Sequence, residues 1–123
     1  MPENTILTRN QVRAEKAYTC VQEKEKAKDE KEYRQLARSF PALVHSCGLV
    51  EAIAFVTAKE NTKDRETGKE YLHHLAKVMP FNPNTLAKES RTAPLLQYQR
   101  LTRDAMDSAA WLKRYAETLL KES

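Results

Sequence analysis

Cations at helical spacing are the residues of this 123-residue chain whose arrangement points most directly to chemistry. In the N-terminal segment, steps of four and three residues place Arg9, Arg13 and Lys16 on one face of a helix. No acid at the same spacing in that segment neutralises them, and they lie near the positive end of the helix dipole, where cations are disfavoured. Because this choice works against the helix itself, it indicates a partner with negative charge. We predict that these three side chains contact phosphates.

A second group of cations lies in the last predicted helix, at Arg100, Arg103, Lys113 and Arg114. Three of the four are followed four residues later by an acid, the spacing at which side chains pair along a helix. The pairs are Arg100–Asp104, Arg103–Asp107 and Lys113–Glu117. Such pairing would quench much of the charge, so an ordinary solvated helix is the competing interpretation. Any contact made here would be to phosphates, which give affinity and register but no choice of sequence.

Arg38 and His45 have a spacing that points to catalysis instead. They enclose the six residues "SFPALV", which resembles the arginine–spacer–histidine motif of the HEPN ribonucleases, a family that is also small and all-helical. The resemblance implies acid–base and phosphate-stabilising roles for the two residues in RNA cleavage. Pro41 in the spacer and Ser39 after the arginine depart from that family's pattern. We therefore expect no enzyme, with an Arg38/His45 ribonuclease as the less favoured alternative.

The histidines and cysteines do not form a metal-binding pattern. His73 and His74 are adjacent and so point about 100° apart on a helix, whereas a shared metal needs steps of three or four residues. Cys20 and Cys47 form no CxxC pair. We expect no metal and no cofactor.

Trp111 is the single tryptophan and lies beside the apolar stripe of the last predicted helix. An aromatic residue at this spacing favours core packing or contact with a protein partner over stacking on a nucleic-acid base. This supports the main non-RNA alternative, a helical adaptor that contacts only proteins. The adaptor predicts that no basic patch survives on the folded surface.

The composition is that of a helical protein. Charged residues make up 31% of the chain and apolar residues 41%, and only two glycines are present. This predicts an all-α fold, a compact bundle of five or six helices in one domain, residues 1–123. The net charge of +4 permits nucleic-acid binding without proving it. With no signal-peptide pattern and no apolar run near the ~20 residues of a membrane span, we expect a cytoplasmic protein without membrane contact.

The helix boundaries can be predicted from capping residues. Thr8 and Gln11 fit a capping box at the start of the first helix, and Asp29 with Glu32 resembles a second start. Gly48 suits a helix end. Between the first two helices, residues 23–32 alternate in charge, which predicts a solvated connection.

The middle of the chain predicts two further helices and the connections between them. Pro41 predicts a kink or a restart within the second helix. Residues 49–56 are apolar on more than one face, which places that helix in the middle of the bundle. Residues 60–69 have a loop-like composition, and the prolines of 80–84 are expected to stop the helix that follows.

The last helix is the most regular element of the sequence. Its apolar stripe alternates steps of three and four residues over about seven turns. The stripe consists of Leu95, Tyr98, Thr102, Ala105, Ala109, Leu112, Ala116 and Leu119.

Two blocks of the sequence resemble a known family when taken together. They are "YRQLARSFPALVHSCGLVEAIAF" at 33–55 and "YQRLTRDAMDSAAWLKRYAETLL" at 98–120, 46 of the 123 residues. The chain resembles the small α-helical subunit of the Cmr complex, the type III-B CRISPR RNA-silencing effector. The features that carry the resemblance are a proline-kinked helix, a "CGL" turn into an apolar helix, and a terminal "YxxLTRxA…WLKRxAE" helix.

The resemblance implies a non-catalytic, RNA-binding subunit of a ribonucleoprotein complex in antiviral defence. Small subunits of this type line up in a filament beside the guide RNA and its bound target RNA. They contact the target-strand backbone, copies of themselves, and the backbone and large subunits of the complex. RNA cleavage belongs to the backbone subunits.

Overall fold

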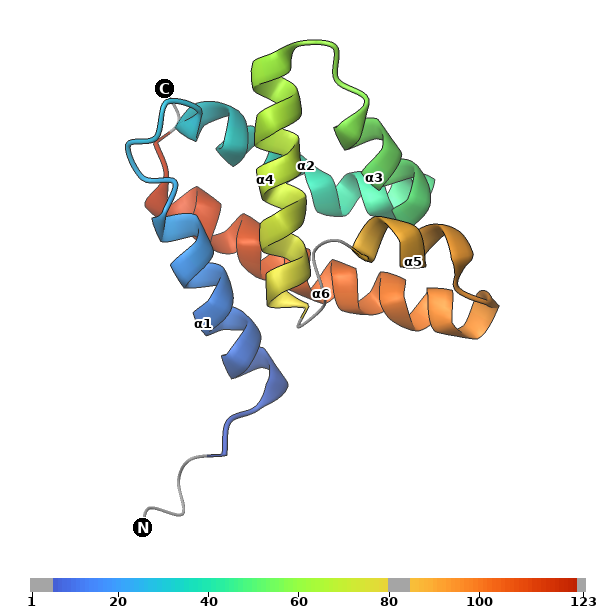
Figure 1. Ribbon diagram of the computed structural model, residues 1–123. Coiled ribbons are helices and arrows are strands. Elements are labelled where there is room, and N and C mark those ends of the chain that lie inside the picture. Colours follow the sequence, from blue (N-terminus) through green and yellow to red (C-terminus); the bar gives the residue numbers. More distant parts are fainter. Residues whose placement is uncertain (1–5, 80–84, 122–123) are drawn as a thin grey trace.

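A computed structural model describes residues 6–79 and 85–121 of the chain. This part of the protein contains six helices and no strand (Figure 1). The helices are α1 (Arg9–Gln22), α2 (Glu30–Cys47), α3 (Leu49–Thr57), α4 (Thr62–Val78), α5 (Leu86–Thr92) and α6 (Leu95–Leu119). The predicted all-α bundle with a long C-terminal helix is confirmed, and α6 is 25 residues long.

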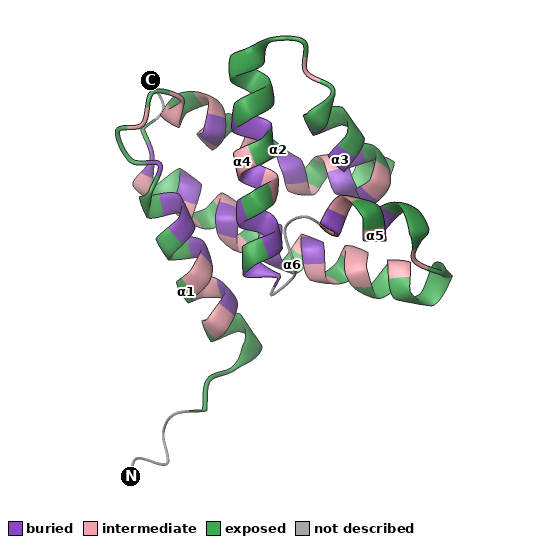
Figure 2. Cartoon of the chain, in the orientation of Figure 1, coloured by how far each residue is buried: buried purple, intermediate pink, exposed green. Residues whose placement is uncertain are grey.

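The core lies where α4 crosses α2 and α6, with α1 on one side of α4 and α3 on the other (Figure 1). The aromatic rings of Tyr33, Phe40 and Tyr71 pack together in this core. The ring centroids of Tyr33 and Tyr71 lie 5.8 Å apart, and those of Phe40 and Tyr71 lie 5.1 Å apart. Both α1 and α2 pack along α6, whose buried residues are mostly small. Figure 2 shows that the buried residues face the inside of the bundle and the exposed ones cover its outer sides.

The predicted helix starts and the predicted Gly48 boundary are confirmed. The Thr8 N–H donates to Gln11 Oε1 at 2.8 Å, and the Gln11 N–H donates to Thr8 Oγ1 at 3.0 Å, which is the reciprocal capping box. Helix α2 begins directly after Asp29. Gly48 has φ +88°, a conformation that side-chain-bearing residues rarely adopt, and it separates α2 from α3.

The structure contradicts one prediction about α4 and half of one about α2. Of the kink or restart predicted at Pro41, the restart is wrong, because α2 continues through Pro41 as one element from Glu30 to Cys47, and the kink stays a prediction. Residues 60–69, predicted as a loop, contain the first two turns of α4, which Asn61 caps by accepting hydrogen bonds from the Lys63 and Asp64 N–H groups at 2.8 and 3.3 Å. The predicted stop at 80–84 lies outside the described residues.

Two apolar side chains predicted to be buried are exposed instead. Phe55 of α3 has an exposed fraction of 54%, so α3 is covered on one side only and does not lie in the middle of the bundle. Leu95 has an exposed fraction of 74%, because the first turn of α6 extends past the helices that bury the rest of its stripe (Figure 1). Leu96 beside it is exposed to 60%.

Gly68 lets α4 pack closely on α3. A Cβ atom at this position would lie 2.6 Å from Val56 Cγ1 and 2.9 Å from the Val56 carbonyl oxygen, closer than van der Waals contact. A backbone oxygen cannot rotate away as a flexible side chain can. The loop-like glycine of the sequence is therefore a close-packing residue inside a helix.

We expect the Gly68→Ala variant to be less stable than the wild type. The clash should cost about 1–3 kcal/mol, which exceeds the ~1 kcal/mol that alanine gains over glycine in a helix. Denaturant unfolding followed by circular dichroism measures the difference. Glu66→Ala, an exposed change in the same helix, should stay within about 0.5 kcal/mol of the wild type. A Gly68→Ala protein as stable as this control would show that α3 and α4 are not in close contact.

Candidate nucleic-acid interface

The fold brings the two predicted groups of cations together. Helices α1 and α6 pack side by side, and a surface groove between them is lined by four arginines and two aspartates. The lining residues are Arg9, Arg13, Arg100, Arg103, Asp104 and Asp107. Four guanidinium groups against two carboxylates leave the groove with a net positive charge. A groove of this kind attracts anions.

Arg13 lies at the base of the groove and is the least exposed of its cations. Its side chain is 10% exposed, and its Nη2 atom lies 2.8 Å from Asp104 Oδ1. Its Nη1 atom lies 3.7 Å from Asp107 Oδ2. No acid of α1 itself pairs with Arg13, as the spacing predicted, but two acids from another helix do. The acids come from α6, which the spacing of residues within α1 does not reveal.

The pairing of Arg13 leaves the other arginines of the groove without the partners predicted for them. Within residues 6–79 and 85–121, Arg9, Arg100 and Arg103 have no carboxylate within 4.0 Å. All three are exposed. The predicted pairs Arg100–Asp104 and Arg103–Asp107 are thus replaced by the contacts of Arg13. The rim of the groove consequently carries three guanidinium groups that face solvent.

The remaining predicted cations lie beside the groove and do not line it. Lys16 is half-buried on α1, one turn beyond Arg13. Successive residues of a helix are about 100° apart, so Arg114 lies on the same side of α6 as Arg103. Lys113 lies about 80° round the helix from Arg103. Lys113 is not paired with Glu117 in the described part of the chain, because Glu117 accepts a hydrogen bond from Arg38 Nε at 3.2 Å.

Trp111 packs within the protein surface. Its ring is stacked with that of Tyr115 at 5.9 Å between centroids, and the Arg114 guanidinium lies 5.3 Å from its centroid. Tyr18 of α1 meets Tyr115 edge-on at 5.3 Å. Trp111 therefore packs against two neighbouring side chains of its own helix, Tyr115 and Arg114. These contacts agree with packing rather than with stacking on bases.

Arg38 and His45 are not assembled into a catalytic site. Seven residues apart on one continuous helix, they share a face of α2 about 10 Å apart along its axis. The Arg38 side chain is 48% exposed and bound to Glu117, and His45 is exposed. In this structure the Arg38 guanidinium pairs with Glu117 at the surface.

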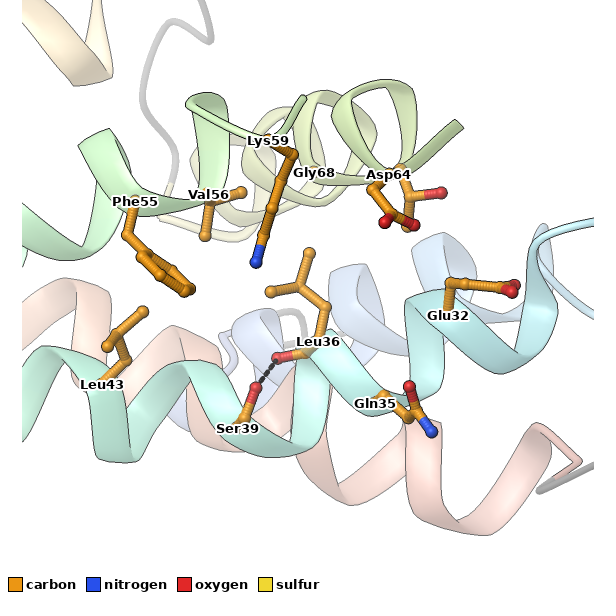
Figure 3. Close-up of a pocket in the computed structure, with 11 residues that line it drawn as sticks. Glu32, Gln35, Leu36, Ser39, Leu43, Phe55, Val56, Lys59, Asp64 and Gly68 are labelled. Carbon is orange, nitrogen blue, oxygen red and sulfur yellow. Dashed lines mark hydrogen bonds between the residues drawn. The ribbon is translucent and has the colours of Figure 1, made fainter. Parts of the chain in front are cut away.

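A second hollow, between α2, α3 and α4, is largely apolar (Figure 3). Leu36 and Leu43 project into it from α2 and Phe55 projects from α3 on the opposite side, and Lys59 Nζ lies 4.0 Å from the centre of the Phe55 ring. The Ser39 hydroxyl donates to the Leu36 carbonyl oxygen at 3.3 Å, so it is engaged by its own helix. None of the residues described as lining this hollow is a histidine or a cysteine, the usual general base or nucleophile.

A buried ion-pair network fastens α1, α2 and α4 to one another. Lys24 is 5% exposed, and its Nζ atom donates to Asp29 Oδ1 at 2.6 Å and to Glu70 Oε1. Asp29 Oδ2 also accepts from the Thr67 hydroxyl at 2.6 Å. Burial alone would lower the pKa of Lys24 and raise that of Asp29, but their hydrogen bonds outweigh it, so the pKa of Lys24 is raised and that of Asp29 lowered.

His74 is the buried titratable group beside this network. Its Nδ1 atom lies 2.7 Å from the Tyr33 hydroxyl oxygen, and its Nε2 atom lies 3.4 Å from Glu23 Oε1. Burial lowers the pKa of His74, although the charges of Glu70 and Glu23 oppose the shift. The fold therefore favours the neutral imidazole, which shares a hydrogen bond with the Tyr33 hydroxyl at Nδ1. Cys20 is also buried, and burial raises its pKa to about 11, so its thiol is not a nucleophile at neutral pH.

Neither a metal centre nor a membrane span is found in the part of the chain that the structure describes. Across residues 6–79 and 85–121, no three histidine, cysteine, aspartate or glutamate side chains gather in a way that could hold a metal ion. No helix in these ranges is long and apolar enough to cross a membrane.

The fold and the groove define a small all-helical protein whose candidate site is a surface of cations rather than a catalytic pocket. Comparison with known proteins places it further. Residues 9–119 match the family model described as "CRISPR-associated protein (Cas_Cmr5)". The chain belongs to the Cmr5 family of CRISPR-associated proteins.

A relative in Thermus thermophilus, named "CRISPR system Cmr subunit Cmr5", is 41% identical over 116 residues, which is 94% of this chain and 98% of the relative. The crystal structure of a CRISPR-associated Cmr5 family protein, also from Thermus thermophilus, is similar with a TM-score of 0.85 and 40% identity. The match covers 94% of this chain and 100% of that one. The resemblance to the small helical Cmr subunit, noted from the sequence, is confirmed.

The lowered pKa of His74 predicts that acid weakens the fold. As the pH falls, His74 takes up a proton near pH 6.5 in the unfolded chain, but only at a lower pH in the folded protein. The contribution of neutral His74 to the free energy of unfolding is therefore complete above pH 6.5 and is lost as the pH falls through the folded pKa. Within that window the free energy of unfolding should fall by up to about 1.4 kcal/mol per pH unit. Urea unfolding between pH 7.5 and 5 measures the slope.

The His74→Gln variant should lose this part of the slope, whereas His45→Gln, a change at an exposed histidine, should keep it. An unchanged slope in His74→Gln would assign the acid sensitivity to other groups.

Proposed function

We propose that this chain is a non-catalytic structural subunit of a type III-B CRISPR ribonucleoprotein effector, the Cmr complex. It helps to bind and position guide and target RNA for cleavage by other subunits, in antiviral defence in the cytoplasm. Membership of the Cmr5 family supports the complex. The observation that carries the RNA contact is the groove between α1 and α6, with three exposed arginines that have no carboxylate partner among the described residues.

The groove fits a phosphate backbone better than a small ligand. Arg9, Arg100 and Arg103 are spread along two helices, and guanidinium groups donate hydrogen bonds in a geometry that matches phosphate oxygens. Lys16 and Arg114 extend the same charge beyond the groove, and Lys113 adds a cation on a neighbouring face of α6. Contacts of this kind give affinity without reading bases, so the choice of target is left to pairing between guide and target RNA.

The proposed protein partners are the other subunits of the complex, including its backbone and large subunits, and further copies of this chain. Exposed apolar side chains on α3 and at the start of α6 support contacts with proteins. Phe55, Leu95 and Leu96 are exposed to 54%, 74% and 60%. Large apolar side chains at a surface are typical of protein interfaces when they lie close together, as Leu95 and Leu96 do.

The alternatives are less well supported by the structure. A protein-only adaptor predicts no basic patch on the folded surface, but the groove gathers four arginines from two helices. A ribonuclease that uses Arg38 and His45 requires a free guanidinium, but Arg38 is bound to Glu117.

We expect the double variant Arg100→Glu/Arg103→Glu to bind RNA more weakly than the wild type. With single-stranded RNA, three phosphate contacts predict a slope of about −2 when log K is plotted against log salt concentration. Reversing the charge of two arginines leaves one contact, so the slope should fall to about −0.7, or binding should become undetectable. Fluorescence anisotropy with a labelled RNA at several salt concentrations measures both affinity and slope. Target-RNA loading by the reconstituted complex should fall in parallel.

The matched control is Lys31→Glu/Lys69→Glu, which reverses two exposed charges on α2 and α4 that do not line the groove. It changes the net charge of the chain by the same amount. If both double variants lose RNA affinity equally, the attraction is a property of the whole chain and the groove is not the site.

A further inference from the structure

Arg13 occupies a different position from the other cations of the groove, because it faces carboxylates rather than solvent. We infer that Arg13 is a positioning residue: by engaging Asp104 and Asp107, it keeps Arg100 and Arg103 free to contact phosphates. This inference rests on the proposed function of the groove. It gives Arg13 a part that does not require it to touch RNA.

The sequence shows what the two aspartates would do without Arg13. Asp104 follows Arg100 by four residues and Asp107 follows Arg103 by four, which is the spacing of ion pairs on a helix surface. Each pair would neutralise one guanidinium at the rim of the groove. The amino-acid sequence of α6 alone therefore favours a self-paired helix with little charge to offer.

The structure shows a competition that Arg13 wins. Arg13 is only 10% exposed, so its charge is poorly hydrated and depends on carboxylate partners. Arg100 and Arg103 are exposed, and water satisfies them, so pairs made by them would contribute little. A guanidinium also has enough donors to meet two carboxylates at once, as the contacts at 2.8 and 3.7 Å show.

The loss of Arg13 should consequently do more than remove one positive charge. It would release two carboxylates into the groove, where Arg100 and Arg103 are their nearest cationic neighbours on the same helix. Lys16 offers a matched control, because Lys16→Gln removes the same charge one helical turn away without releasing an acid. The two single variants therefore separate the loss of charge from the release of carboxylates.

The test is a double-mutant cycle on RNA affinity, measured by anisotropy with a labelled single-stranded RNA. Its corners are the wild type, Arg13→Gln, Asp104→Asn/Asp107→Asn, and the triple variant. Two released carboxylates that each pair with an arginine should weaken binding by about two- to fivefold beyond the loss seen in Lys16→Gln. The change Asp104→Asn/Asp107→Asn should raise RNA affinity in both backgrounds. The gain in the Arg13→Gln background should exceed the gain in the wild type by the same two- to fivefold. An equal or larger gain in the wild type would overturn the inference, because Arg13 would then act through its own charge or by direct contact.

A second readout does not depend on RNA. Phenylglyoxal modifies exposed, unpaired arginines, and peptide mass spectrometry reports each site separately. Arg100 and Arg103 should react more slowly in Arg13→Gln than in the wild type, and the triple variant should restore their rates. Unchanged rates would overturn the inference even if RNA binding falls. If these rates change as expected but Arg100→Glu/Arg103→Glu binds RNA normally, the pairing is correct and the proposed function is wrong.

Arg13 also joins α1 to α6, so each variant is first checked by circular dichroism and thermal unfolding. Where Arg13→Gln does not fold, Arg13→Lys replaces it in both measurements. A lysine keeps the charge but carries its donors on one nitrogen atom, so it lacks the second nitrogen with which Arg13 meets Asp104 and Asp107 separately. It should therefore release one aspartate and give a smaller change of the same sign. Wild-type reactivity and affinity in Arg13→Lys would contradict the positioning role.

Discussion

The close packing of α1 and α2 along α6 is the constraint on which the rest of the structure depends. The side chains that α6 buries include Ala105, Ser108, Ala109 and Ala116, which are small enough to let neighbouring helices approach. Longer side chains on the two flanks of α6 then meet partners from the helix on each side. Asp104 meets Arg13 of α1 on one flank, and Glu117 meets Arg38 of α2 on the other. The groove of arginines is thus a consequence of how α6 is packed, and it depends on α1 being held in place.

A second set of charges holds the opposite end of α1. Lys24 follows the end of α1 and is nearly buried, with Asp29 at the start of α2 and Glu70 of α4 as its partners. Because a buried ion is costly unless it is paired, this network ties three helices to one relative position. The charged residues of the chain therefore have two roles. Lys24 and Arg13 join helices through ion pairs, whereas the exposed cations of the groove make no such pair within the described part of the chain.

Local signals in the sequence predicted the helices well, and contacts between helices account for most of the errors. The capping box at Thr8 and the end at Gly48 depend on neighbours a few residues away, so the sequence is sufficient for them. Residues 60–69, which include Gly68, were predicted as a loop, because nothing in that segment reveals the approach of Val56 to Gly68. The alternating charges of 23–32 similarly indicated a solvated connection, although Lys24 within them is buried. The same distinction applies to the candidate site, where the cations were identified within single helices but their partners were assigned by i to i+4 spacing alone. Arg13 and Asp104 are 91 residues apart, and only the packing of α1 on α6 brings them together.

A groove with few exposed cations suits a subunit of a larger complex better than an independent RNA-binding protein. Three phosphate contacts give weak, salt-sensitive affinity, and contacts to the backbone do not select a sequence. In the proposed assembly the same groove would be held beside RNA bound by other subunits, so its effective concentration would be high and weak contacts would be sufficient. A stronger patch would bind unrelated RNA as well as the paired target. In this view the two aspartates at the base of the groove, balanced by Arg13, limit the affinity of the isolated subunit while leaving the arginines at its rim available to the complex.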